Sequence, residues 1–508
     1  MIKKNEIPLL FLIIIFFSTF IFFHLNPLIN WYEGNIENLY FIYNSILSSL
    51  KIKPVVIDYP GTPSFIINGF AYNIFLGEFS SISEIGDQYE INNYLNYTLK
   101  INKYIQLIYL SLYFIFVFKI LNEFNSKNIY SNFLLTVAII FSLPMIENFQ
   151  LARIENDALF FLSIGTYFYI RFIKTNSLIN FFLFNIFFLL MLLTKILYVF
   201  TIYLLIIILF YFKKEKILNY LDKLNLFSTL VLINVFLFFS LYGIQIFLNK
   251  LYFISIIFSL ATYGLVASSL IYFFFILKID LKKLFLCLSC SLIAIIFLFY
   301  LTNSNFSHLY YVIFPFDLLK QHLRGAHSLD ANFIEQIILI IKKIYLNFSE
   351  FKIYLYEVFI LISFLIVFLI NFKLNLINFF LVSLYFLFKI IFNIKYYLYY
   401  DSITFLLLTI VFSNLFTNNI KLKYFLTFCV LIISIYSTHK IIIYDELQVN
   451  NKLKSNEIIK NFCRYSLITE EEFNKLDIDD PENYALYHTK NLMTYNNIKK
   501  ICLNKLQI

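Results

Sequence analysis

Glycine, proline and charge are all scarce in this chain of 508 residues, which holds only nine glycines and eight prolines. Charged residues make up 14% of the sequence, against about 25% in soluble domains. Hydrophobic residues make up 60%, and the mean hydropathy is +0.77. These values exclude an ordinary soluble globular protein, because so much apolar surface could not be kept out of water.

Cysteine is also rare, with five residues in all. Cys287 and Cys290 lie in an apolar run and Cys429 in another, where buried, inert thiols are the usual finding. Cys463 and Cys502 lie in a polar tail, where they would be able to pair in an oxidising compartment. We predict no metal site from these residues.

What the chain has instead is a succession of apolar runs, each about the length of a membrane-spanning helix. The sequence therefore predicts an all-α polytopic membrane protein with roughly thirteen transmembrane helices. The expected spans are 8–25, 104–122, 130–148, 158–173, 178–193, 196–212, 226–247, 252–276, 284–302, 352–371, 374–393, 402–417 and 422–442.

The net charge of +9 is spread over short loops, where it predicts orientation. A cytoplasmic N-terminus places Lys119, Lys127, Arg171 and Lys174 inside, together with the cations of the other short loops. The long segments 26–103 and 303–351 then lie outside, as does a C-terminal module at 444–508 that follows a transmembrane domain at 1–443. An interior N-terminus and an outer C-terminus indicate a multi-pass membrane protein. The abundance of Ile, Phe, Asn, Lys and Tyr suits an AT-rich bacterial genome, so we expect it in the bacterial inner (cytoplasmic) membrane.

The first outer loop concentrates the residues that bend a backbone, with five of the nine glycines and four of the eight prolines. Two segments in it, 36–50 and 63–77, are expected to form helices that lie in the plane of the interface. The acids Glu33 and Glu37 precede or begin the first of these helices. We interpret either one as a candidate general base, with N-terminal capping as the alternative.

Further charges lie at predicted outer helix ends. Arg153, Glu155 and Asp157 occupy one short turn, where they would supply a second carboxylate and a phosphate-binding cation, or simply be solvated. Lys195 interrupts a long apolar stretch, either as a functional intramembrane cation or as a lysine that snorkels at a helix hairpin. Arg324 either binds phosphate or lies in a solvated loop. Lys395 and Tyr396 belong to an interfacial aromatic belt, with binding of a lipid phosphate as the less favoured interpretation. In the first loop, Asp58, Tyr59, Pro60 and Gly61 are expected to shape the backbone.

Three local patterns resemble the GT-C superfamily of integral membrane glycosyltransferases, in particular the bacterial branch related to protein mannosyltransferases and aminoarabinose transferases. Glu37-x-x-Tyr40-x-x-x-Asn44-x-x-Leu47, followed by Tyr59-Pro60-Gly61-Thr62-Pro63, is similar to the first-loop pattern of that family. Arg153-x-x-x-Asp157 resembles its second outer loop, and Thr194-Lys195 and Lys395-Tyr396 resemble later segments. Two positions depart from the pattern: the family usually has Asp where Glu33 and Glu37 compete, and His where Tyr59 stands.

The resemblance implies that the protein transfers a sugar from a polyprenyl-phosphate donor to a lipid, glycan or protein acceptor, with inversion, at the outer face of the membrane. It implies a carboxylate base among Glu37, Glu33 and Asp157, with Arg153, Lys195, Arg324, Lys395 and Tyr396 around the donor phosphate. It implies no nucleic-acid partner and no definite cofactor, and it leaves a divalent metal open. The alternatives are a flippase or transporter of lipid-linked glycans, or a polysaccharide polymerase or ligase; spans nearly free of charge argue against transport.

Overall fold

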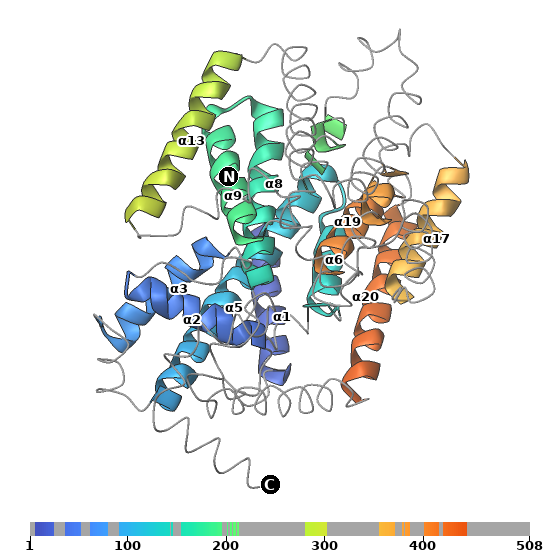
Figure 1. The fold of residues 1–508 in the computed structure, drawn as a ribbon. Coiled ribbons are helices and arrows are strands. Elements are labelled where there is room, and N and C mark those ends of the chain that lie inside the picture. Colours follow the sequence, from blue (N-terminus) through green and yellow to red (C-terminus); the bar gives the residue numbers. More distant parts are fainter. Residues whose placement is uncertain are drawn as a thin grey trace, which may run out of the picture.

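The computed structural model describes somewhat less than half of the chain. The described residues are 6–24, 36–51, 61–79, 91–142, 144–145, 154–195, 201, 204–205, 207–209, 211–212, 280–301, 355–370, 378–379, 381–386, 401–415 and 420–443. Within them every regular element is a helix, which agrees with the predicted all-α class (Figure 1). The elements are α1 (Ile7–His24), α2 (Ile36–Ser49), α3 (Thr62–Leu76), α5 (Ile91–Phe124), α6 (Ile129–Ile140), α8 (Ile154–Thr175), α9 (Leu178–Thr194), α13 (Leu281–Leu301), α17 (Leu355–Ile370), α19 (Asp401–Asn414) and α20 (Ile420–Ile443).

One helix in the described part of the chain, at Asn93–Phe124, is both long and apolar enough to cross a membrane. The shorter apolar helices are Ile7–Ser18, Ile129–Ile140, Leu178–Thr194, Phe285–Leu298, Leu355–Ile370 and Ile403–Asn414. The predicted spans at 226–247 and 252–276, the outer segment 303–351 and the tail from 444 onward lie outside the described residues.

α8 is the centre of the arrangement that carries the site, because it packs along both α5 and α9. Aromatic side chains fill these interfaces: the rings of Tyr109 and Phe160 stack with centroids 4.7 Å apart, and those of Phe168 and Phe187 lie 6.2 Å apart. α8 and α9 form a tight antiparallel hairpin. Its turn places Asn176 at φ 53°, a left-handed conformation that asparagine tolerates after a helix.

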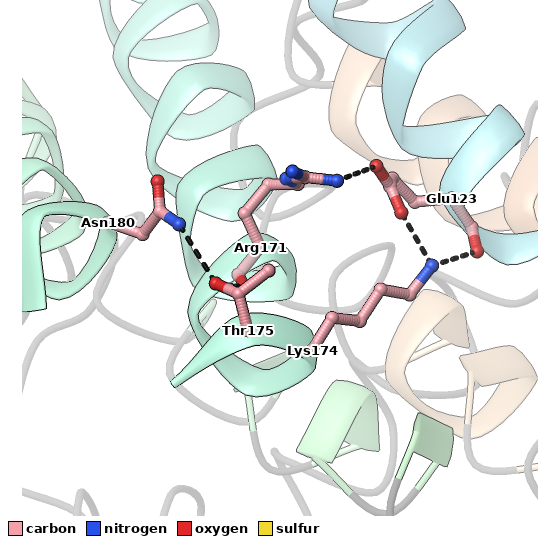
Figure 2. Close-up of polar contacts among 5 residues, drawn as sticks. All are labelled: Glu123, Arg171, Lys174, Thr175 and Asn180. Carbon is pink, nitrogen blue, oxygen red and sulfur yellow. Dashed lines mark hydrogen bonds and ion pairs between the residues drawn. The ribbon is translucent and has the colours of Figure 1, made fainter. Parts of the chain in front are cut away.

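The C-terminal ends of α5 and α8 meet in a cluster of charges, so the two helices run in the same direction (Figure 2). Glu123 of α5 accepts from Arg171 of α8 over 3.4 Å and from Lys174 over 2.5 Å. The Lys174 ammonium also donates to the Glu123 carbonyl over 2.8 Å. These partly exposed pairs contribute little stability, but they place the basic residues of α8 at one end of the hairpin.

The same region contains a buried polar network that joins α5 to the later helices. The Asn125 side-chain amide donates to the Ser413 carbonyl over 2.8 Å, and the Lys423 ammonium donates to the same oxygen. The Tyr211 hydroxyl contacts the Asn414 side-chain oxygen at 3.1 Å. Hydrogen bonds between elements so far apart in sequence hold α19 and α20 against α5.

The two short helices expected in the first outer loop are confirmed as α2 and α3, but the next boundary was wrong. The span predicted from residue 104 belongs to a helix that begins at Ile91. The additional turns are polar in sequence, yet they bury Tyr94, Leu95 and Leu99, and that burial favours the helical extension. α6, by contrast, ends at Ile140 instead of continuing to 148, because Pro144 follows shortly after it.

α2 and α3 lie against each other and cross at a single glycine. A Cβ atom added to Gly69 of α3 would lie 2.8 Å from the backbone oxygen of Ser45 and 2.8 Å from the backbone nitrogen of Ser49. Both atoms belong to the backbone of α2, which cannot move aside as a side chain can. Glycine at this position therefore sets how closely the two helices approach.

We expect Gly69→Ala to destabilise the protein by about 1–3 kcal/mol, because the added methyl group would push α3 away from α2. The matched control is Gly165→Ala in α8, where the nearest atom would be the Phe188 nitrogen at 3.5 Å, an ordinary contact. That variant should keep or increase stability, since alanine favours a helix. Thermal unfolding of the full chain in detergent measures both, and equal midpoints for the two variants would contradict the close approach.

Candidate functional site

A buried ion pair joins the two ends of the α8–α9 hairpin opposite the basic cluster. The Lys195 ammonium, just after α9, lies 2.7 Å from a carboxylate oxygen of Glu155 in the first turn of α8. The two residues are 6% and 1% exposed. Lys195 is therefore not a solvated, snorkelling lysine, and that interpretation of the sequence was wrong. Charges buried to this degree are retained in proteins when they are paired or functional.

Asp157, two residues beyond Glu155, is also fully buried. In the described part of the chain no group donates a hydrogen bond of normal geometry to either of its carboxylate oxygens. The Ser64 hydroxyl of α3 lies near the carboxylate and partly stabilises its charge. Burial nevertheless raises the pKa of Asp157 well above its ordinary value; Ser64 lowers it in part, and the negative charge of Glu155 raises it again. The result is a carboxyl group that gains and holds a proton readily.

The residues at the start of α3 place the Ser64 hydroxyl near Asp157. Gly61 precedes the helix and is buried, and Pro63 lies in the first turn, where a proline costs no hydrogen bond. Ser64 follows at once, and its hydroxyl lies near the Asp157 carboxylate. Gly61, the last residue of the segment expected to shape the loop, therefore directly precedes the helix that brings Ser64 near Asp157.

α5 contacts α8 at Asn156, the residue next to Asp157. The Asn156 side-chain amide donates to the Gln106 side-chain oxygen over 3.2 Å, with both residues buried. One turn earlier on α5, Asn102 accepts a hydrogen bond of 2.5 Å from the Tyr72 hydroxyl of α3. Two polar contacts therefore tie α5 to its neighbours, one on α8 beside Asp157 and one on α3.

The residues predicted for the site divide into those that the structure brings together and those that it does not describe. Asp157 and Lys195 lie in one buried cluster, and Gly61 begins the helix above it. Glu37 lies in α2, but its side chain is outside the described residues. The remaining candidates, Glu33, Asp58, Tyr59, Pro60, Arg153, Arg324, Lys395 and Tyr396, also lie outside them, as do Cys463 and Cys502.

Sequence reasoning missed the neutral members of the cluster, namely Ser64, Asn68, Asn102, Gln106 and Asn156. A signal was present, because Ser64 and Asn68 are four residues apart, as are Asn102 and Gln106. Polar residues at this spacing share one face of a helix. In helices that are otherwise apolar, such a stripe indicates a polar contact inside the protein.

The described residues contain no group of three or more His, Cys, Asp or Glu side chains able to hold a metal ion. Cys287 and Cys290 lie one helical turn apart on α13 in a Cys-x-x-Cys spacing, and Cys290 is exposed. The expectation of buried thiols was therefore wrong for Cys290, and Cys287 and Cys429 are only half-buried. α13 packs mainly against α9, which leaves much of its surface uncovered.

No protein-family model, no characterised protein and no solved structure matches this chain. The buried cluster is therefore the basis on which a function is assigned.

Proposed function

We propose that the protein is a GT-C-like integral membrane glycosyltransferase of about thirteen spans, which moves a sugar from a polyprenyl-phosphate donor to an acceptor at the outer membrane face. The observation that carries this proposal is the burial of Asp157 beside the Glu155–Lys195 ion pair, where apolar helices end. The family resemblance supports it only as an analogy.

The surface of the described helices fits contact with lipid. Leu369 and Ile370 of α17 are 82% and 79% exposed, and Phe285 of α13 is 72% exposed. Apolar side chains exposed on several helices at once are characteristic of surfaces that meet another apolar phase. The basic cluster at Glu123 lies at the end of α8 opposite Asp157, as the positive-inside rule requires if Asp157 faces outward.

The chemistry assigned to the cluster is a single displacement. Asp157 takes the proton of an acceptor hydroxyl, and the freed oxygen attacks the anomeric carbon of the sugar. The bond from that carbon to the phosphate oxygen breaks, and the polyprenyl phosphate leaves with the bonding electrons. Attack from the side opposite the phosphate inverts the anomeric carbon. Lys195 provides positive charge near the reaction, balanced at rest by Glu155.

The test is transfer in proteoliposomes that contain the full chain and radiolabelled polyprenyl-phosphate hexose or pentose. We expect the wild type to release free polyprenyl phosphate, and Asp157→Asn to abolish most of that release. Glu33→Gln and Glu37→Gln are compared in parallel, because the resemblance implies a base among these three acids. If all three variants match the wild type, the assignment of the site is wrong.

The same assay separates an enzyme from a transporter. A flippase would move the labelled lipid between leaflets without breaking the bond between the sugar and the phosphate. Absence of bond cleavage by the wild type with every donor would overturn the proposed function.

A further inference from the structure

A row of polar side chains extends from Asp157 along the interface of α3 with α5, and we call it the polar seam. It consists of Ser64, Asn68 and Tyr72 of α3, Asn102 and Gln106 of α5, and Asp157 of α8. Ser64, Asn68 and Tyr72 follow each other at intervals of four residues and therefore lie on one face of α3. The seam is tied at both ends, by the Tyr72–Asn102 hydrogen bond and by the proximity of Ser64 to Asp157.

The middle of the polar seam lacks partners. Asn68 is fully buried, and neither its side-chain nitrogen nor its side-chain oxygen is hydrogen-bonded to any residue of the described chain. The Asn102 side-chain nitrogen is in the same condition, and the Ser64 hydroxyl, which lies near the Asp157 carboxylate, makes no hydrogen bond of normal geometry within the described chain. Buried polar groups without partners cost free energy, so a row of them in contact with a buried acid points to a ligand that supplies the missing bonds.

The chemistry of the polar seam restricts what that ligand is. Its open groups are two amides and one hydroxyl, which together offer donors and acceptors and carry no charge. At the Ser64 end of the seam the charged groups are the carboxyl groups of Asp157 and Glu155, and Lys195 is paired with Glu155. An anionic ligand would therefore meet acidic groups at this end of the seam. A neutral group with several hydroxyls, each of which both donates and accepts, matches all of these features.

We infer that the polar seam is the subsite for a carbohydrate acceptor, in which Asn68 and Ser64 bind hydroxyl groups of a pyranose and direct one of them toward Asp157. This inference rests on the proposed function and makes it more specific, since it narrows the acceptor to a sugar with free ring hydroxyls. Asn68 becomes a residue that determines acceptor specificity. Asn102, fixed by Tyr72, supplies a further donor on the opposite wall.

Binding of simple sugars tests the inference without any need for transfer. The full chain is purified in a detergent whose head group carries no sugar, and its unfolding midpoint is measured with methyl α-mannopyranoside or methyl β-glucopyranoside. The comparison compound is 2-methoxytetrahydropyran, which has the ring but no hydroxyl groups. We expect at least one pyranoside to raise the midpoint of the wild type, and the comparison compound to have no effect.

The decisive variant is Asn68→Leu. Removing a buried amide that lacks partners should leave the midpoint without sugar unchanged or higher, while the apparent affinity for the pyranoside falls by about tenfold or more. The control is Asn185→Leu in α9, where another buried side-chain nitrogen has no partner in the described chain, in a helix segment away from the polar seam. That variant should keep full affinity for the sugar.

Two results would overturn the inference: no pyranoside stabilises the wild type, or Asn68→Leu binds sugar as the wild type does. The second result would mean that water alone fills the polar seam. Failure of the proposed function is a separate outcome. If sugar binds and Asn68→Leu abolishes binding, but no polyprenyl-phosphate donor is ever cleaved, the seam binds carbohydrate in a protein that is not a transferase.

Discussion

Replacing Lys195 with methionine is expected to destabilise the protein by about 3–5 kcal/mol, the cost of leaving a buried charge without its partner. Glu155 is 1% exposed and lies 2.7 Å from the Lys195 ammonium, so its carboxylate would lose the cation that balances it. The thermal unfolding midpoint of the full chain in detergent measures the loss.

A double variant shows whether the pair itself is responsible. Lys195→Met combined with Glu155→Leu removes both charges and should recover most of the lost stability, because an apolar pair of similar volume is tolerated in such a place. If the single and double variants are equally unstable, packing around Lys195 matters more than its charge. An unchanged midpoint in the single variant would show that the ion pair does not form.

The second large effect is that of Asp157→Asn, which should lower the transfer activity without lowering the stability of the protein. Asp157→Asn should lower transfer by about 100-fold to 10,000-fold, the usual contribution of a general base. The same variant should be at least as stable as the wild type at neutral pH, because an amide has no charge to bury. A loss of activity that came with unfolding would instead mark Asp157 as a structural residue.

The pH dependence follows from the raised pKa of Asp157. Between the pKa of the unfolded chain and the higher pKa of the folded protein, the folded state holds a proton that the unfolded state has released. Stability therefore falls as the pH rises through this window. Ser64, Glu155 and Tyr109 interact with the carboxyl group and are kept unchanged in the comparison. Unfolding midpoints measured across the acidic range should decline for the wild type and be flatter for Asp157→Asn; identical slopes would contradict the assignment.

The helical architecture was largely available from the sequence, because long runs of Phe, Ile and Leu permit little else. The helices at 158–173 and 178–193 appear as α8 and α9 with nearly those limits. The start of α5 was missed because residues 91–103 are polar. Their helix depends on contacts with other segments, such as the burial of Tyr94 and the bond between Asn102 and Tyr72.

The candidate site was predictable only in part. Asp157 and Lys195 stood out as charges at apolar helix ends, but the partner of Lys195 was not identified. That partner follows only once α8 and α9 are known to fold back on each other, which brings Glu155 to the end of α9. The spacing of Ser64 and Asn68 indicated a polar face on this helix, but the burial of Asn68 without a hydrogen-bond partner in the described chain depends on the tertiary structure.

The tight turn between α8 and α9 also bears on how the chain is made. Glu155 is synthesised before α9 and Lys195 directly after it, so the two charges are able to meet once this hairpin closes, before any later helix exists. A carboxylate and an ammonium that enter an apolar environment as a neutral couple avoid most of the cost that each would meet alone. The ion pair would thereby lower the cost of burying the two ends of this hairpin as the chain folds.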